Sequence, residues 1–203
     1  QHWQPAEVLR WKRDQLAATL HQRGLDVAVE PVIATPAGER RRARLAMRRD
    51  GDVIRVGFRE RGAHAVVDIG SCPLLAPALG KVLVPLRAVA SHVLKRSEDV
   101  AVELALTDSG VDVLLEQERE PTTAQRSAWA GFATTHGLAR VAWRPTAVAA
   151  PELLVMVQQP TVTLGGVTVN LPPGTFLQAS PTAERALVVE VIAASAKARR
   201  VID

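Results

Sequence analysis

The feature that most constrains the fold of this chain is a pair of alternating segments joined by a turn. The segments RARLAMRR (42–49) and VIRVGFRE (53–60) flank the tripeptide Asp50-Gly51-Asp52. Aspartate and glycine favour the backbone angles of a tight turn, and alternation of apolar and charged residues is typical of strands with one buried face. The sequence therefore predicts a β-hairpin, and its apolar face must be covered by other elements.

The two faces of the predicted hairpin differ in character, because alternate side chains of a strand point to opposite sides. One face is apolar and consists of Ala43, Leu45, Met47, Ile54, Val56 and Phe58. The other face is basic and consists of Arg42, Arg44, Arg48, Arg55 and Arg59. We expect the apolar face to contribute to the core and the basic face to remain accessible.

Positive charge is concentrated around this hairpin. Residues 40–61 contain nine arginines and three acidic residues, a charge of +6 within a chain whose net charge is +4. Guanidinium groups on a rigid strand can donate paired hydrogen bonds to phosphates, which favours RNA or DNA binding. A solvated face with scattered Asp and Glu partners is the alternative. The candidate RNA-binding residues are Arg40, Arg41, Arg42, Arg44, Arg48, Arg55 and Arg59.

The rest of the sequence alternates between predicted helices and strands. Helices are predicted at 5–23, at 122–136 and after Ser180, which suits an N-cap. A helix within 73–94 should be broken or start late, because Pro77, Gly80 and Pro85 interrupt it. Strands are predicted at 26–33, 64–69, 99–106, 111–117, 138–144 and 152–159, with a further hairpin at 161–171 around Gly165-Gly166. This order predicts an α+β fold that is rich in antiparallel sheet and has flanking helices.

Composition narrows the class of protein. No stretch reaches the roughly 18 consecutive apolar residues of a membrane span, and the first residues are too polar for a signal peptide. A single cysteine, Cys72, excludes an internal disulfide and fits a reducing compartment, so we expect a cytoplasmic protein. The chain begins at Gln1 without methionine and ends at 201–203 as if entering a strand. We therefore expect a segment of a longer protein.

Motifs of the common enzyme classes are absent. The sequence has no G-x-S-x-G, P-loop or G-x-G-x-x-G motif, and its five histidines lack metal-binding spacing. Cys72 together with His64 could act as a nucleophile and its base. For a lone cysteine, a buried structural thiol is the usual role.

Four segments, taken in order, resemble a known enzyme family. They are ERRRARLAM, VGFRERGAHAVVDIGSCPLLAPAL, LPPGTFLQASPTAERAL, and a last helix leading to VID. Together they are similar to the bacterial 23S rRNA uracil-5 methyltransferases, which use S-adenosylmethionine and contain a [4Fe–4S] cluster. The resemblance implies a parent protein with an N-terminal RNA-binding barrel, a central α+β domain at 1–172, and a Rossmann-like methyltransferase domain that begins within 173–203.

The resemblance also implies roles for individual residues. Cys72, which precedes a proline, falls on the fourth cysteine ligand of the cluster, and four thiolates are the usual ligand set. Gln178, within GTFLQAS, would lie near the methyl donor and the target base, with Phe176 as a wall of the pocket. Asp203 would open the donor-binding loop. The family's nucleophile and general base lie further along, so no catalytic residue is expected within this chain.

Two functional hypotheses follow. The first is the central segment of an S-adenosylmethionine-dependent RNA uracil-5-methyltransferase acting on 23S rRNA, with tRNA as the alternative substrate. This segment would be inactive alone and would bind neither the methyl donor nor the [4Fe–4S] cluster by itself. The second is a stand-alone nucleic-acid-binding α+β module with no catalytic role. Neither hypothesis requires a membrane or an obligate protein partner.

Overall fold

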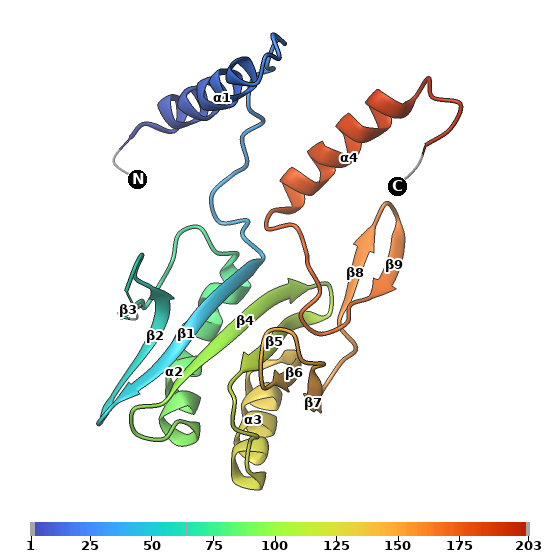
Figure 1. The fold of residues 1–203 in the computed structure, drawn as a ribbon. Coiled ribbons are helices and arrows are strands. Elements are labelled where there is room, and N and C mark those ends of the chain that lie inside the picture. The colour runs from blue at the N-terminus through green and yellow to red at the C-terminus, as the bar shows by residue number, and fades with distance from the viewer. Residues whose placement is uncertain (1–2, 64, 202–203) are drawn as a thin grey trace. The chain divides into compact units, whose positions relative to one another are not determined.

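A seven-stranded sheet organises the unit Ala37–Pro181, in the order β3-β2-β1-β4-β5-β6-β7 (Figure 1). Every neighbouring pair is antiparallel except β5 and β6. The strands are β1 (Arg42–Asp50), β2 (Val53–Arg59), β3 (Val66–Asp68), β4 (Asp99–Thr107), β5 (Gly110–Glu116), β6 (Leu138–Arg144) and β7 (Glu152–Met156). A separate hairpin pairs β8 (Thr161–Leu164) with β9 (Val167–Asn170). The predicted α+β class and both predicted hairpins are confirmed, and the predicted strands at 99–106 and 111–117 pair as a third hairpin.

The structure is a computed structural model that describes residues 3–63 and 65–201. The described residues outside the sheet-containing unit, 3–36 and 182–201, form a second unit. They contain α1 (Pro5–Gln22) and nearly all of α4 (Pro181–Ser195), which confirms both predicted terminal helices. Neither helix has a buried residue. No helix within the described ranges is long and apolar enough to cross a membrane.

Helices α2 (Pro77–Val93) and α3 (Thr123–His136) cover one face of the sheet (Figure 1). Helix α3 joins β5 to β6, and a crossover of this kind is what allows two successive strands to run parallel. The core lies between the helices and the sheet. It includes the apolar face of the β1–β2 hairpin, where Met47 and Val56 are fully buried in the same cluster as Leu79 and Leu83 of α2. The predicted core face is therefore confirmed.

Local sequence signals account for the ends of these helices. Helix α2 has Pro77 at its start, where a missing backbone N–H costs nothing, which is the late start that the sequence predicted. The capping box of α3 is formed by Thr122 and Gln125. Gly137 ends α3 in the left-handed conformation, with φ of 62°, which glycine adopts without a steric cost.

Asp68 fastens the edge strand β3 to its neighbours. Its carboxylate accepts hydrogen bonds from the backbone N–H of Val56 at 2.8 Å and from Nη2 of Arg87, on α2, at 2.6 Å. Partial burial on its own would raise the pKa of Asp68, but the bonds from Val56 and Arg87 outweigh it and the pKa is lowered. The carboxylate is therefore held in its charged form.

The predicted strand at 26–33 is wrong. Residues 25–36 form neither helix nor strand, and Leu25, Val27 and Ile33 are 51%, 59% and 54% exposed. A strand needs a neighbouring strand that takes up its backbone N–H and C=O groups, and no strand among the described residues pairs with this segment, whose Val29 carbonyl accepts instead from Nε of Arg13 at 2.8 Å. The alternation of apolar and polar residues at 26–33 is therefore not enough to form a strand. Val201 is likewise exposed and outside any strand.

Candidate functional site

The sheet face opposite to α2 and α3 carries charged side chains of both signs. Near its middle, Arg44 donates to Glu103 at 2.5 Å and to Glu116 at 2.7 Å. Arg144 of β6 contacts the same two carboxylates, at 3.0 Å and 3.1 Å. Burial on its own lowers the pKa of Arg44, but its pairing with Glu116 and Glu103 outweighs this effect and raises it. The four side chains form one alternating network.

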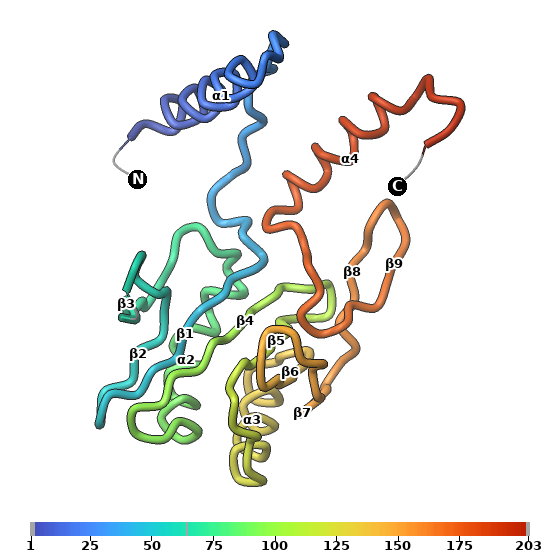
Figure 2. Tube along the Cα trace, in the orientation of Figure 1, coloured from blue at the N-terminus to red at the C-terminus, as the bar shows by residue number. Residues whose placement is uncertain are grey.

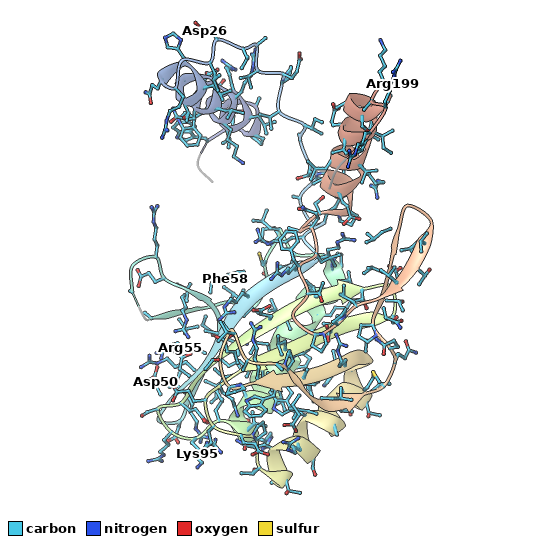
Figure 3. All side chains as sticks on the ribbon, turned by 45° about the vertical axis from the view of Figure 1, so that its right-hand side comes forward. Asp26, Asp50, Arg55, Phe58, Lys95 and Arg199 are labelled. Carbon is cyan, nitrogen blue, oxygen red and sulfur yellow. The ribbon has the colours of Figure 1, made fainter. Side chains whose placement is uncertain are left out.

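A second group of ion pairs lies at the turn end of the β1–β2 hairpin. Arg48 and Arg55 both donate to the carboxylate of Asp50, at 2.9 Å and 2.6 Å. Arg59 binds Asp99 of β4 through two hydrogen bonds, at 2.7 Å and 2.8 Å. Figure 3 shows Asp50 and Arg55 side by side at this end of the sheet. Arg48 and Arg55 lie directly opposite one another across β1 and β2, and the carboxylate of Asp50 that they share relieves their repulsion.

The predicted arginine face thus exists, but carboxylates from other strands lie within it. Arg42 is 3.6 Å from Glu103, and the rest of the face is paired as described above. Asp99, Glu103 and Glu116 lie outside residues 40–61, so the local charge of that stretch does not reveal them. The alternation of 99–106 could have shown that two of these share a face, although not which strand they would meet. RNA binding by the arginines stays a prediction.

The segment that follows β9 returns to the start of β1 (Figure 2). The backbone N–H of Arg41 donates to the carbonyl of Ala179 at 2.8 Å, and its guanidinium Nε donates to the carbonyl of Gln178 at 2.9 Å. The hydroxyl of Ser180 donates to the carboxylate of Glu39 at 2.8 Å. Two stretches separated by 137 positions in the sequence are therefore joined.

A cavity with a volume of about 270 Å³ opens where this segment meets β1. The guanidinium carbon of Arg42 lies 5.2 Å from the centre of the Phe176 ring, within the range of a cation–π contact. The side chain of Phe176 is 66% exposed. The side-chain amide of Gln178 makes no hydrogen bond to any residue that the structure describes. The cavity is lined by Arg40, Arg42, Ala43, Arg44, Phe176, Leu177, Gln178 and Ala179.

This arrangement brings together three kinds of group that suit a nucleotide. An exposed aromatic ring can stack on a base, arginines can hold a phosphate, and a free amide offers both donors and an acceptor to a base edge. Of the predicted RNA-binding residues, Arg40, Arg42 and Arg44 line the cavity, whereas Arg48, Arg55 and Arg59 belong to the ion pairs at the far end of β1.

Cys72 lies in the loop between β3 and α2, close to the start of β1. It is partly buried and packs against the main core. The backbone of Arg40 joins this loop, because its N–H donates to Leu74 at 3.0 Å and its C=O accepts from Ala76 at 2.8 Å. Arg40, which lies two positions before β1, thus binds the Cys72 loop and also lines the cavity.

The residues around Cys72 do not by themselves fit an iron–sulfur cluster. In the ranges 3–63 and 65–201 no group of three or more His, Cys, Asp or Glu side chains is placed to hold a metal ion. These residues supply at most one thiolate, whereas a [4Fe–4S] cluster takes four ligands. His64, the candidate base for Cys72, and Asp203, the expected start of the donor-binding loop, lie outside the described residues.

Comparison with known proteins relates the chain to RNA methyltransferases. It is 33% identical, over its entire length, to an uncharacterized RNA methyltransferase of Brucella suis biovar 1 (strain 1330), of which it covers 48%. It is 34% identical, again over its entire length, to one of Caulobacter vibrioides, of which it covers 49%. It is 33% identical, over 87% of its length, to the 23S rRNA (uracil(1939)-C(5))-methyltransferase RlmD of Halomonas elongata, of which it covers 38%.

These matches confirm the resemblance that the sequence motifs indicated. The chain spans about half the length of the curated relatives that it matches along its whole length. No protein-family model matches it.

Proposed function

We propose that this chain is the central part of an S-adenosylmethionine-dependent RNA uracil-5-methyltransferase that acts on 23S rRNA in the cytoplasm. The observation that supports this most strongly is the similarity over most of the chain to a protein named as a 23S rRNA uracil-C5 methyltransferase. The remainder of the parent protein would supply the nucleophile, the general base and most of the methyl-donor site. The segment alone would then be inactive.

In this proposal the cavity beside β1 receives part of the RNA or the methionine end of the methyl donor. Phe176 forms one wall, and the free amide of Gln178 hydrogen-bonds the uracil edge or the donor. In uracil-5 methylation a thiolate adds to C6, which makes C5 nucleophilic enough to take the methyl group from the sulfonium of the donor. A base then removes the C5 proton and the thiolate leaves. The residues of this chain hold and orient the reactants.

The predicted arginines have a graded role in the same proposal. Arg40 and Arg42 lie at the cavity and contact the RNA backbone directly. Their existing contacts are long: Arg42 is 3.6 Å from Glu103, and Arg40 donates from Nε to the carbonyl of Arg42 at 3.1 Å. The remaining five, namely Arg41, Arg44, Arg48, Arg55 and Arg59, hold carboxylates or carbonyls at 2.5–2.9 Å and would contribute less, because a phosphate must replace a closer partner. RNA binding is then strongest near the start of β1.

We also propose that Cys72 is one of four thiolate ligands of a [4Fe–4S] cluster, as the resemblance implies. The other three ligands would precede Gln1 in the parent protein. Such a cluster would fix the Cys72 loop near Arg40, and no step of the methyl transfer is assigned to it.

The release of tritium from RNA tests the proposed reaction. Methylation at C5 expels the C5 hydrogen, so the full-length parent protein, given S-adenosylmethionine and [5-³H]uridine-labelled 23S rRNA, should release tritium into water. Gln178→Ala should lower the rate about tenfold, the factor that corresponds to one lost hydrogen bond of about 1.4 kcal/mol. Gln158→Ala, which truncates an exposed glutamine away from the cavity in the same way, is the control for the partly buried Gln178.

Two outcomes would contradict the proposal in different ways. Release from tRNA but not from 23S rRNA would retain the enzyme class and change the substrate. Salt-dependent RNA binding without any tritium release from either RNA would instead support the stand-alone binding module.

A further inference from the structure

Arg140 of β6 and Asp112 of β5 form a buried ion pair on the sheet face opposite to the helices. Arg140 donates to both carboxylate oxygens, from Nε at 2.9 Å and from Nη2 at 2.7 Å. Each of the two side chains is only 5% exposed. Removing two charges from water costs free energy that their attraction recovers only in part, so apolar residues in the same place could stabilise the sheet equally well. The stability of the sheet alone therefore does not explain why these two positions hold charged residues.

A third hydrogen bond of Arg140 suggests that reason. Its Nη2 also donates to the backbone carbonyl of Leu171, at 2.9 Å. Leu171 directly follows β9 and begins the segment that carries Phe176 and Gln178. The side chain of Leu171 packs with Leu177 in a small apolar cluster that is separate from the main core. The buried guanidinium therefore links the sheet to the first residue of this segment.

The same segment is held at its other end by Arg41. The contacts of Arg41 with Gln178 and Ala179, described above, fix the segment to the start of β1. Between the two attachments the segment lies close against the sheet, since a Cβ at Gly174 would come within 2.9 Å of Leu114 on β5. Phe176 and Gln178 are thus carried on a stretch that is anchored on both sides.

We infer that the Arg140–Asp112 pair positions the cavity: it fixes residues 171–179 against the sheet so that Phe176 and Gln178 face Arg42. An arginine suits this role because its planar guanidinium can donate two hydrogen bonds to a carboxylate and a further one to a carbonyl. The two bonds to Asp112 fix the orientation of the guanidinium. Arg140 and Asp112 are positioning residues and do not contact the ligand. The inference rests on the proposed function only for what the cavity binds.

Hydrogen exchange on the 203-residue chain tests the anchoring directly. The double variant Asp112→Leu/Arg140→Met replaces the pair by apolar side chains, which preserves the packing of the sheet and removes the bond to Leu171. The backbone amides of Leu171 and Thr175, which donate to Pro160 and Pro172, should exchange about tenfold faster. Amides of β1 and β4 should keep their rates.

The control variant is Arg126→Met. It removes ion pairs with Glu120 and Glu152 outside the cavity and should leave exchange at Leu171 and Thr175 unchanged. Unchanged exchange at Leu171 and Thr175 in the double variant would overturn the inference. Faster exchange of β1 and β4 to the same extent would also overturn it, because the pair would then stabilise the sheet as a whole.

The same double variant in the full-length protein connects the anchoring to function. Its kcat/KM for tritium release should fall about tenfold, as for Gln178→Ala, while Arg126→Met retains the original value. If the unmodified protein releases no tritium, the proposed function fails and the exchange result still decides whether the segment is anchored. If the unmodified protein and the double variant release tritium equally well, the positioning role is overturned.

Discussion

Replacing Gly174 by alanine measures how firmly residues 171–179 are held against the sheet. Gly174 has a φ of +73°, a conformation that costs alanine about 1–2 kcal/mol. The added Cβ would lie 2.9 Å from Cδ2 of Leu114 and 3.4 Å from Nη1 of Arg144. Leu114 is only 2% exposed, so it can yield only by leaving its rotamer, at a cost of about 0.5–1.5 kcal/mol. We expect Gly174→Ala to lower the free energy of unfolding by about 1.5–3.5 kcal/mol.

Gly62 offers a matched control for the backbone contribution. Its φ of +74° is nearly the same, but no heavy atom lies within 4 Å of the position that a Cβ would take. Gly62→Ala should therefore lose only the backbone contribution of about 1–2 kcal/mol. The difference between the two variants, about 1 kcal/mol, isolates the contact with Leu114. Urea unfolding followed by circular dichroism gives both values, provided that the m-values agree.

Equal losses in the two glycine variants would refute this reasoning. They would mean that residues 171–179 lift away from the sheet at almost no cost, so that the new Cβ never meets Leu114. The positioning of Phe176 and Gln178 by Arg140 would then lose its physical basis as well.

Three further predictions concern the sheet edge, the cavity and the thiol. The pKa of Asp68 is lowered in the folded chain, so its contribution to stability is complete above about pH 4 and is lost as the pH falls through the lower, folded-state pKa. Asp68→Asn should therefore reduce the loss of unfolding free energy at acidic pH, and an unchanged loss would contradict the assignment. Arg42→Gln should reduce the slope of log K against log salt for RNA binding by about 0.7–0.9, while Arg59→Gln should change it less; equal slopes in a filter-binding titration would mean that the cavity is not the main RNA contact. In the parent protein Cys72→Ser should lower the iron and sulfide content, and equal cluster occupancy would exclude Cys72 as a ligand.

Most helices and strands of this fold were predictable because their signals are local. The turn Asp50-Gly51-Asp52 and the pair Gly165-Gly166 each lie between two alternating segments, and Gly137 ends a helix by its own backbone preference. The strand at 26–33 failed because alternation describes a half-buried strand without saying whether a neighbour exists. Strand formation depends on residues far away in the sequence.

The chemistry of the sheet face was not predictable for the same reason. Arg44 meets Glu103 only because β1 pairs with β4, with Arg44 opposite Glu103 in the register, and β2, β3 and α2 intervene in the sequence. A local count of charges could identify a basic hairpin, but it could not identify the carboxylates that the rest of the sheet brings to it. The contacts of Arg140 with Asp112 and Leu171 depend on sheet order in the same way.

The residues singled out by the resemblance lie far apart in the sequence, yet the loops that carry them attach to one short stretch of backbone. The Cys72 loop pairs with Arg40, the carbonyl of Gln178 accepts from Arg41, and the ring of Phe176 lies against Arg42. Since these three arginines are consecutive, a shift of one residue at the start of β1 would disturb all three attachments at once. These three arginines thus hold together the residues that line the cavity, and under the proposed function any contact with RNA would be made by side chains that these contacts orient.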